Sequence, residues 1–297
     1  MTAEATAGGG FRRVAVVIDD WPTHDAAIGM ALTIVAADGE LIFVQAVNRV
    51  ALTENCTTPH EIAVVLDAVD VEESRLLSSA VAWAAARGVR STTRVLDADG
   101  FASLEDFVRE APFDAVSVGT HADGRTSARR LGPTAKAFLR SSPAPVFINC
   151  EEDAARAEAV LRNVLVVLDG SIPQQPIAES AIALARRSGA RLVFAHVDDG
   201  VSPHSLDRDA LASARNAAVR AGLATCIVSL YGYTSAAINA AAQVAGADAI
   251  VLGEIERGAT RSPQPAAVVN MVIRTAQVPV CVVPVQGAAA LRRKHVA

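Results

Sequence analysis

The chain has 297 residues, of which 51% are hydrophobic and only 4% aromatic, and its formal net charge is -5. This length is sufficient for two ordinary domains, whose cores would consist mainly of Ala, Val, Leu and Ile. A chain with net negative charge lacks the basic surface that favours binding to nucleic acids and anionic membranes, so we expect neither partner.

The composition and the termini indicate a cytoplasmic protein. The four cysteines are widely scattered and form no Cys-x2-Cys pair, which argues against a disulfide framework and against a metal site. Residues 1–10 lack the basic and apolar regions of a signal peptide, and we expect them to be disordered. The longest apolar runs fall far short of the ~20 residues that a membrane span requires.

The first half of the chain is expected to alternate between strands and helices. Short apolar runs followed by Ala-rich amphipathic stretches are typical of βαβ units, which build a parallel sheet. In chain order, the expected elements are a strand within Val14–Pro22, a helix at Thr23–Ala36, a strand at Gly39–Val47, a variable segment at Asn48–Val71, a helix at Glu72–Arg87, a strand at Gly88–Leu96, a helix at Ser103–Glu110, a strand at Asp114–Gly119, a glycine-bearing loop, a last helix and a strand at Pro145–Cys150.

Three glycines in the chain fit the ends of predicted helices. Gly39, Gly88 and Gly189 each follow a helical stretch, where a left-handed residue commonly ends a helix.

The second half of the chain repeats the pattern of the first half. Asp19 and Asp169 lie in matching stretches at an offset of 150 (169 − 19). Later matches, including Pro145 with Pro279, have an offset of 134 (279 − 145), so one insertion of 16 residues (150 − 134) separates the copies. The insertion lies between Val47 and Gly88. Four co-linear blocks with one gap indicate an internal duplication.

The duplication defines the expected domain organisation. We predict two copies, at residues 11–150 and 161–286, joined by a polar linker at residues 151–160 and followed by a tail at residues 287–297. The fold class is α/β, with two tandem open five-stranded parallel sheets of Rossmann-like topology.

A ligand of such a sheet is expected at the carboxyl ends of the strands, where the strand order reverses. The relevant loops therefore follow strands one and four of each copy. In copy 1 they contain Asp19, Gly119, Ala122, Gly132 and Thr134, and in copy 2 they contain Asp169, Gly170 and Gly253.

At these residues the chain resembles the universal stress protein family in its tandem form, over nearly all of residues 12–285. The resemblance rests on the Asp-Gly-Ser after strand one of copy 2, on the glycine after strand four and on the Pro-initiated final strand. It implies an adenine nucleotide alpha hydrolase-like fold and two copies paired through their last strands into an internal pseudo-dimer. It also implies an ATP site, in which Gly-x2-Gly-x9-Gly-[Ser/Thr] contacts the phosphates and the strand-one Asp contacts the adenosine end.

Copy 1 keeps the spacing of that pattern but not all of its residues. Gly119 and Gly132 match, whereas Ala122 replaces the second glycine and Pro133 replaces Ser/Thr. Ala is compatible only with a negative φ, and Pro offers no N–H to a phosphate. Thr134 supplies a hydroxyl one residue later. Three arginines of this loop supply positive charge, namely Arg125, Arg129 and Arg130. We expect a weakened ATP site here, with Mg²⁺ only if ATP binds.

Copy 2 has the opposite defect. Its Asp169, Gly170 and Ser171 match the family, but its phosphate loop has carboxylates at Glu254 and Glu256. Negative charges in one cleft repel a triphosphate, so we expect no triphosphate to bind to copy 2. An uncharged or smaller ligand is the alternative.

Structural interpretations of the same residues remain open. Gly119 and Gly253 would then be turn glycines, and Asp19 and Asp169 would cap helices. Three functions follow: a non-catalytic stress-related regulator, a scaffold whose nucleotide sites have decayed, or an enzyme that hydrolyses ATP or processes adenylates. A homodimer and a protein partner that the sequence does not identify are also consistent with it, and the scaffold would use Asn48–Val71 for contact.

Overall fold

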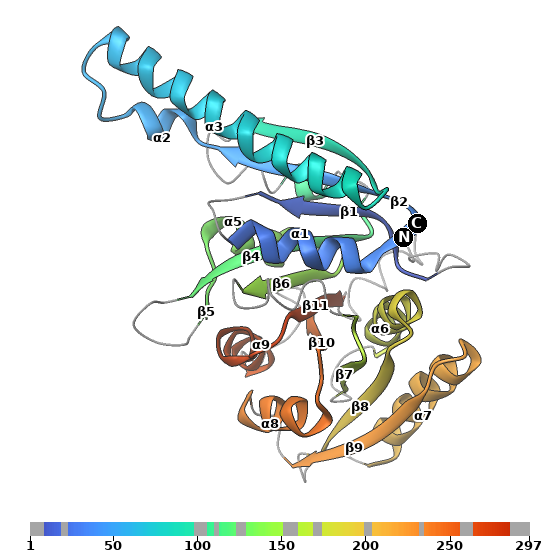
Figure 1. Ribbon diagram of the computed structural model, residues 1–297. Helices are drawn as coiled ribbons and strands as arrows, with labels where there is room; N and C mark the ends of the chain where they lie inside the picture. Colours follow the sequence, from blue (N-terminus) through green and yellow to red (C-terminus); the bar gives the residue numbers. More distant parts are fainter. Residues whose placement is uncertain are drawn as a thin grey trace, which may run out of the picture.

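In a computed structural model of the chain, eleven described strands join into one sheet (Figure 1). The structure describes residues 9–18, 23–97, 106–109, 113–122, 129–150, 160–168, 174–198, 204–231, 235–255 and 264–285. Ten strands follow the order β3-β2-β1-β4-β6-β11-β10-β7-β8-β9, and β5 pairs with β4 beside this path.

Each half of the sheet has the same strand order. The first half contains β1 (Phe11–Val17), β2 (Val35–Val47), β3 (Arg90–Asp97), β4 (Ala115–Ala122), β5 (Arg129–Arg130) and β6 (Val146–Cys150). The second half contains β7 (Asn163–Leu168), β8 (Arg191–Asp198), β9 (Thr225–Tyr231), β10 (Ala249–Ile255) and β11 (Val280–Val285). Apart from β5, the strands of each half pair in parallel, which confirms the predicted tandem α/β fold.

Helices cover both faces of the sheet because the strands are apolar on both faces. One face packs against α1 (Thr23–Ile34), α3 (Pro59–Ala86), α6 (Gln175–Ser188) and α7 (His204–Arg220). The other face packs against α5 (Pro133–Ser141), α8 (Ser235–Ala245) and α9 (Gln264–Thr275). Strands buried on both faces read as continuous Val- and Ile-rich runs, and this explains the low aromatic content.

The two halves meet at their last strands. β6 and β11 pair antiparallel, with Val280 opposite Ile148 and Val282 opposite Val146. Two contacts between the halves flank this joint: the Nε of Arg187 donates to the Val35 carbonyl at 2.7 Å, and the Gly10 amide donates to the Ala183 carbonyl at 2.9 Å. The predicted pairing through the last strands is therefore confirmed.

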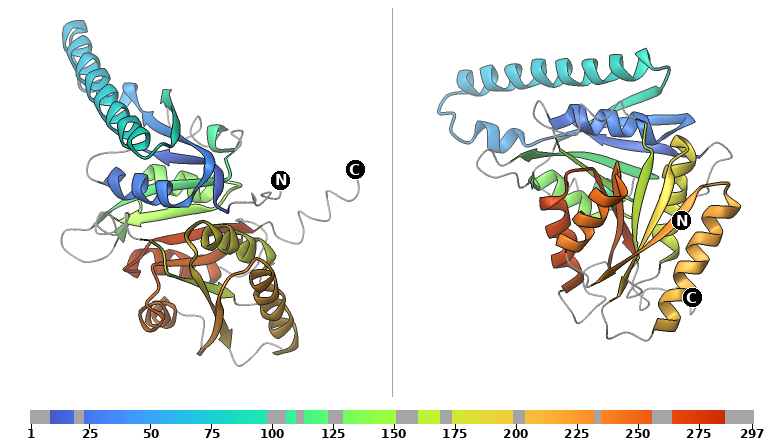
Figure 2. Two further views of the ribbon diagram at one scale, coloured as in Figure 1. Left: turned by 45° about the vertical axis from the view of Figure 1, so that its right-hand side comes forward. Right: turned by 60° about the horizontal axis from the view of Figure 1, so that its bottom comes forward.

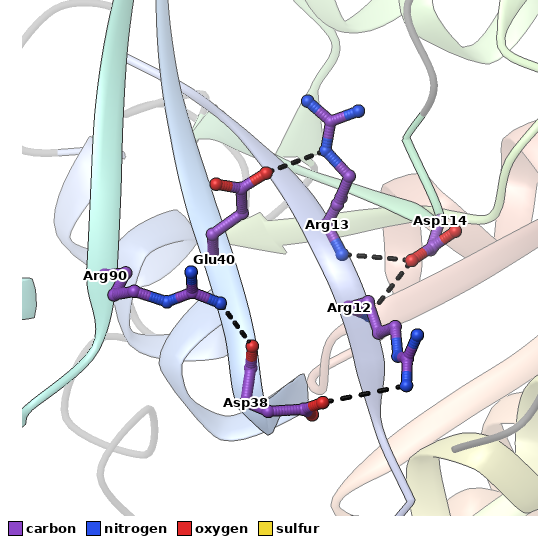
Figure 3. Close-up of polar contacts among 6 residues, drawn as sticks. All are labelled: Arg12, Arg13, Asp38, Glu40, Arg90 and Asp114. Carbon is purple, nitrogen blue, oxygen red and sulfur yellow. Dashed lines mark hydrogen bonds and ion pairs between the residues drawn. The ribbon is translucent and has the colours of Figure 1, made fainter.

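An aspartate at the same position in each half binds backbone amides at the amino ends of the strands. Figure 3 shows this contact for Asp114 of the first half, which lies directly before β4. The Oδ2 of Asp114 accepts hydrogen bonds from the amides of Arg12 and Arg13, both at 3.0 Å. In the second half, Asp248 accepts from the amides of Arg162 and Asn163 in the same way. The Arg13 Nε also contacts Glu40 at 2.8 Å, and Arg90 donates to the Asp38 carbonyl. The hydrogen bonds to the two aspartates hold the first strand of each half in register with its fourth strand.

The inserted segment forms a helical arm. It contains α2 (Arg49–Thr53), and the first half of α3 projects beyond the sheet (Figures 1 and 2). The predicted helix start at Glu72 is wrong, because a capping box starts α3 thirteen residues earlier: Thr58 Oγ1 accepts from the Glu61 amide, and the Glu61 carboxylate accepts from the Thr58 amide. The Nη1 of Arg49 contacts Asp70 at 2.6 Å and ties α2 to α3.

Two further expectations need correction. Helix α1 ends at Ile34, and Gly39 lies inside β2 instead of at a helix end; a Cβ there would stand 2.8 Å from the Arg12 carbonyl oxygen. Gly88 and Gly189 do have positive φ values of 70° and 72° after their helices, as predicted. Gly9 and Gly10, the last residues of the N-terminal segment, are buried.

Three of the predicted segments lie outside the described residues. They are residues 1–8 of the N-terminal segment, residues 151–159 of the linker and the tail at residues 287–297. In the residues that the structure does describe, every helix is too short or too polar to cross a lipid bilayer.

Candidate functional site

The strand order reverses between β1 and β4 in the first half. The chain runs from β1 outward to β2 and β3 and then returns to β4 on the other side of β1, so the direction of winding reverses there. The equivalent point of the second half lies between β7 and β10. Ligands of open α/β sheets bind outside the carboxyl ends of strands at such points.

The two glycines that were expected to end strand four and to start the glycine-bearing loop lie inside strands that continue beyond them. Gly119 pairs with Asn149 within β4 and β6, and Gly253 pairs with Val283 within β10 and β11. Both strands continue past the glycine, β4 as far as Ala122 and β10 as far as Ile255. The expectation of a glycine loop starting at these residues is therefore wrong. Pairing with β6 and then with β5 extends β4, and pairing with β11 extends β10.

Ala122 occupies a conformation that any residue can adopt. It lies at the end of β4, paired antiparallel with Arg129 of β5. Among the described residues, no non-glycine residue has a positive φ, so the alanine meets the condition under which it can replace the family's glycine. Residues 123–128, with Gly124 and Arg125, lie outside the described residues.

Gly132 and Thr134 are placed at the beginning of α5. Gly132 is the N-cap, with φ −65° and ψ 171°, Pro133 is the first helical residue and Thr134 is half-buried. No side chain caps this end, and a Cβ on Gly132 would meet no atom within 4 Å. The first turn of α5 contains no acidic residue. Free amides and the helix dipole at such an end favour an anion.

The second half differs at the equivalent place. The counterpart of Gly132 at the 134-residue offset is Ala266, and α9 begins two residues before it, at Gln264. The residue that opens the helix in the first half is thus inside the first turn in the second half. Glu254 lies in β10, and Glu256 lies outside the described residues.

The strand-one residues are not placed. Asp19, Asp169 and Gly170 all lie outside the described residues, so the structure brings together only part of the predicted site. That part consists of Gly119 and Ala122 on β4 and of Gly132 and Thr134 at the start of α5.

Sequence reasoning missed a buried polar group beside Gly119. The Nδ2 of Asn149 donates to Ser117 Oγ at 3.0 Å and to the carbonyls of Val118 and Phe147 at 3.0 and 3.2 Å. Ser117 Oγ donates in turn to the Ala27 carbonyl of α1 at 2.8 Å. Both side chains are fully buried. This group joins α1 to β4 and β6 at the centre of the sheet.

The polar group exists in one half only. At the 134-residue offset, Ser117 corresponds to Val251 and Asn149 corresponds to Val283. Comparing the copies position by position, instead of block by block, would have revealed this difference. Cys150 and Cys281 are buried, and burial raises the pKa of the Cys281 thiol far above its ordinary value. No group of metal-ligating side chains occurs in the described part of the chain.

Comparison with known proteins supports the tandem arrangement. The model of the universal stress protein family matches the chain twice, at residues 10–148 and 161–284. A search of curated proteins found no match. A universal stress protein from Archaeoglobus fulgidus DSM 4304 has a similar structure, with a TM-score of 0.70 and 17% identity, covering 91% of this chain and 97% of that protein.

Two other solved structures have the same overall fold. A functionally unknown protein from Pseudomonas aeruginosa PAO1 has a TM-score of 0.57 at 17% identity, with 93% of each chain covered. The cytoplasmic domain of a prokaryotic cation chloride cotransporter has a TM-score of 0.53 at 9% identity, covering 92% of this chain and 95% of that domain. At these identities the likeness concerns the fold alone. The two matches to the family model together span most of the sequence, and the chain therefore belongs to the universal stress protein family, with two copies of its domain in tandem.

Proposed function

We propose that the chain is a non-catalytic regulatory protein of the stress-response type, with at most one weakened adenine nucleotide site, located in the first half. The observation that carries this proposal is the difference between the two helix starts. Gly132 opens α5 with an unobstructed N-cap, whereas Ala266 lies within the first turn of α9.

The described residues of the first half fit the phosphate end of a nucleotide. Ala122 has an allowed backbone, a side chain at Gly132 would meet no atom within 4 Å, and Thr134 is the second residue of α5. The exposed Lys136 adds positive charge one turn into the helix. Asp19 is the residue proposed for the adenosine end, and Asp169, Gly170 and Gly253 would serve only an uncharged or smaller ligand in the second half. Mg²⁺ would accompany ATP only if ATP binds.

Calorimetric titration with ATP, ADP and AMP in the presence of Mg²⁺ tests the proposal. We expect binding of one nucleotide per chain and its loss in Gly132→Val, since the added side chain fills the space in front of the helix without backbone strain. Ala267→Val is the matched control, because this exposed alanine is the counterpart of Pro133 in the second half. The absence of binding heat for all three nucleotides would refute the nucleotide-sensing role. Unchanged binding by Gly132→Val would show that the nucleotide binds elsewhere in the chain.

The non-catalytic part of the proposal has its own test. Sustained release of phosphate or pyrophosphate from ATP, abolished by Gly132→Val, would show an enzyme instead of a regulator. We expect no turnover beyond one equivalent.

The helical arm favours a second candidate function, a scaffold that binds a partner. Val64 and Val71 lie seven residues apart on α3, so they share one face of the helix, and they are 54% and 69% exposed. Apolar side chains gathered on one exposed face can contact a partner. Deleting residues 53–67 removes the outer arm. Unchanged nucleotide binding combined with loss of an identified partner would support the scaffold, and retention of that partner would refute it.

A further inference from the structure

The two ends of the sheet differ in charge. β3 forms one end and β9 the other, and each has a neighbouring strand on one side only within the described residues. β3 carries Arg90, Arg94 and Asp97, whereas β9, with the sequence TCIVSLY, carries no charged residue and no proline. Natural proteins protect edge strands with charges, prolines or bulges, because an unprotected edge is a template for another strand.

The outer side of β9 presents backbone groups in a regular row. The Leu192 amide donates to the Ala224 carbonyl at 2.9 Å, and Leu192 is the register partner of Thr225. In a parallel ladder this arrangement directs the backbone groups of Cys226 and Val228 towards β8. The N–H and C=O groups of the alternate residues, Ile227 and Ser229, therefore point away from the sheet.

We propose that two copies of the chain associate through antiparallel pairing of β9 with β9 about a two-fold axis at Val228. This register places Ile227 of each copy opposite Ser229 of the second copy, so the outward-directed backbone groups face one another. Because the strand has no charged side chain, the symmetric pairing brings no like charges together. The chain already uses the same chemistry where β6 and β11 pair antiparallel between its halves.

The helix beside β9 supports a second copy as the occupant. α7 lies alongside β8 and β9 at the outer end of the sheet (Figure 2). Because α7 lies over β8 and β9, the axes of the two α7 helices in the proposed dimer would be about 10 Å apart. This is the usual spacing of packed helices. Asp209 lies near the start of α7 and Arg220 is its last residue, and both are exposed. An antiparallel pair of α7 helices places Asp209 of one copy near Arg220 of the other, so these charges are complementary.

The β3 end offers a matched control for the test. Ile227 on β9 is 42% exposed, and Val95 on β3 is 45% exposed. A lysine at either position introduces the same charge on an edge strand, but only Ile227→Lys places it in the proposed contact. Ile227→Pro is a second variant, because it removes an outward N–H while leaving the β8–β9 ladder intact.

The experiment is sedimentation velocity of the full-length chain from about 1 to about 100 µM, a range that covers ordinary dimer affinities. We expect a monomer–dimer equilibrium in the wild type and in Val95→Lys. In Ile227→Lys or Ile227→Pro the dissociation constant should rise at least about tenfold, as when a central contact is lost. Far-ultraviolet circular dichroism verifies that each variant is folded.

Backbone hydrogen exchange gives a second readout. The amides of Ile227 and Ser229 should become protected as concentration rises, while those of Cys226 and Val228 should be protected throughout. A wild-type chain that stays monomeric at the highest concentration overturns the proposal. So does a dimer that is weakened by Val95→Lys and unaffected by Ile227→Lys, or one in which the alternate amides of β9 show no dependence on concentration.

Discussion

Replacing Asn149 by aspartate tests the buried polar group that holds α1 to the sheet. The two side chains are nearly identical in shape, so the substitution changes hydrogen bonding while packing stays the same. The Nδ2 that donates to the carbonyls of Val118 and Phe147 is replaced by an oxygen. An ionised carboxylate would then stand against two carbonyl oxygens at a position with no exposed surface.

The loss of folding free energy in Asn149→Asp follows from the ionisation of the new carboxyl group in the unfolded chain. In the folded protein the new carboxyl group stays protonated, because its pKa is raised by burial and by the facing carbonyls. In the unfolded chain it ionises with an ordinary pKa of about 3.9. Keeping it neutral at pH 7 therefore costs about 4 kcal/mol, and the cost falls by about 1.4 kcal/mol for each pH unit towards pH 4. The folded-state pKa is raised, so stability is recovered on acidification and lost as pH rises.

Urea unfolding at intervals between pH 4 and pH 7 measures this difference against the wild type. Asn149→Val is the control, because the second half has Val283 at the equivalent position. It removes the same donor without introducing an ionisable group, and it should cost about 1–2 kcal/mol at every pH. A destabilisation by Asn149→Asp that does not change with pH would refute the reasoning, because it would mean that the carboxylate finds solvent or a cation in the folded state.

Three further predictions concern other parts of the chain. Burial raises the pKa of the Cys281 thiol, so iodoacetamide at pH 8 should modify it only after unfolding in urea, and rapid labelling of the native protein would contradict this. Hydrogen bonds from the backbone and side chain of Thr57, and then from the Thr58 amide, lower the pKa of Glu61. The stabilisation that they give the α3 start is therefore present above pH 4.5 and is lost as pH falls through the lowered value. Amide exchange in the first turn of α3 should accelerate in Thr58→Ala, and an unchanged rate would show that the capping box is dispensable. Arg187→Ala removes the bond to the Val35 carbonyl and should lower the free energy of unfolding by about 1 kcal/mol, which urea titration would detect.

The duplication made most of the fold predictable from the sequence. Apolar runs at matching offsets gave the strands, and the shared order implied the same topology in both halves. Helix boundaries were harder, because they depend on caps. Thr58 and Glu61 form a recognisable capping box, yet the apolar residues that follow it have no partner in the sheet, and this made the segment resemble a loop.

The candidate site was less predictable than the fold. Gly132 and Pro133 form the start of α5, and a glycine followed by a proline is a sequence pattern typical of an N-cap and a first turn. Glycine spacing could not show that β4 continues past Gly119 to Ala122, because that depends on pairing with β6 and β5, which lie later in the chain. The buried bond between Ser117 and Asn149 was likewise hidden in runs that otherwise predict an apolar core.

The pairing of β6 with β11 within a single chain has a consequence for how the protein behaves on dilution. Halves that associate as separate molecules come apart as their concentration falls, but these two are covalently joined and stay together at any concentration. A substitution in one half therefore always faces the unchanged other half, and no symmetric pair of mutant halves ever forms. The two copies are free to diverge at matching positions, as Asn149 and Val283 have done, while the joint between them stays the same.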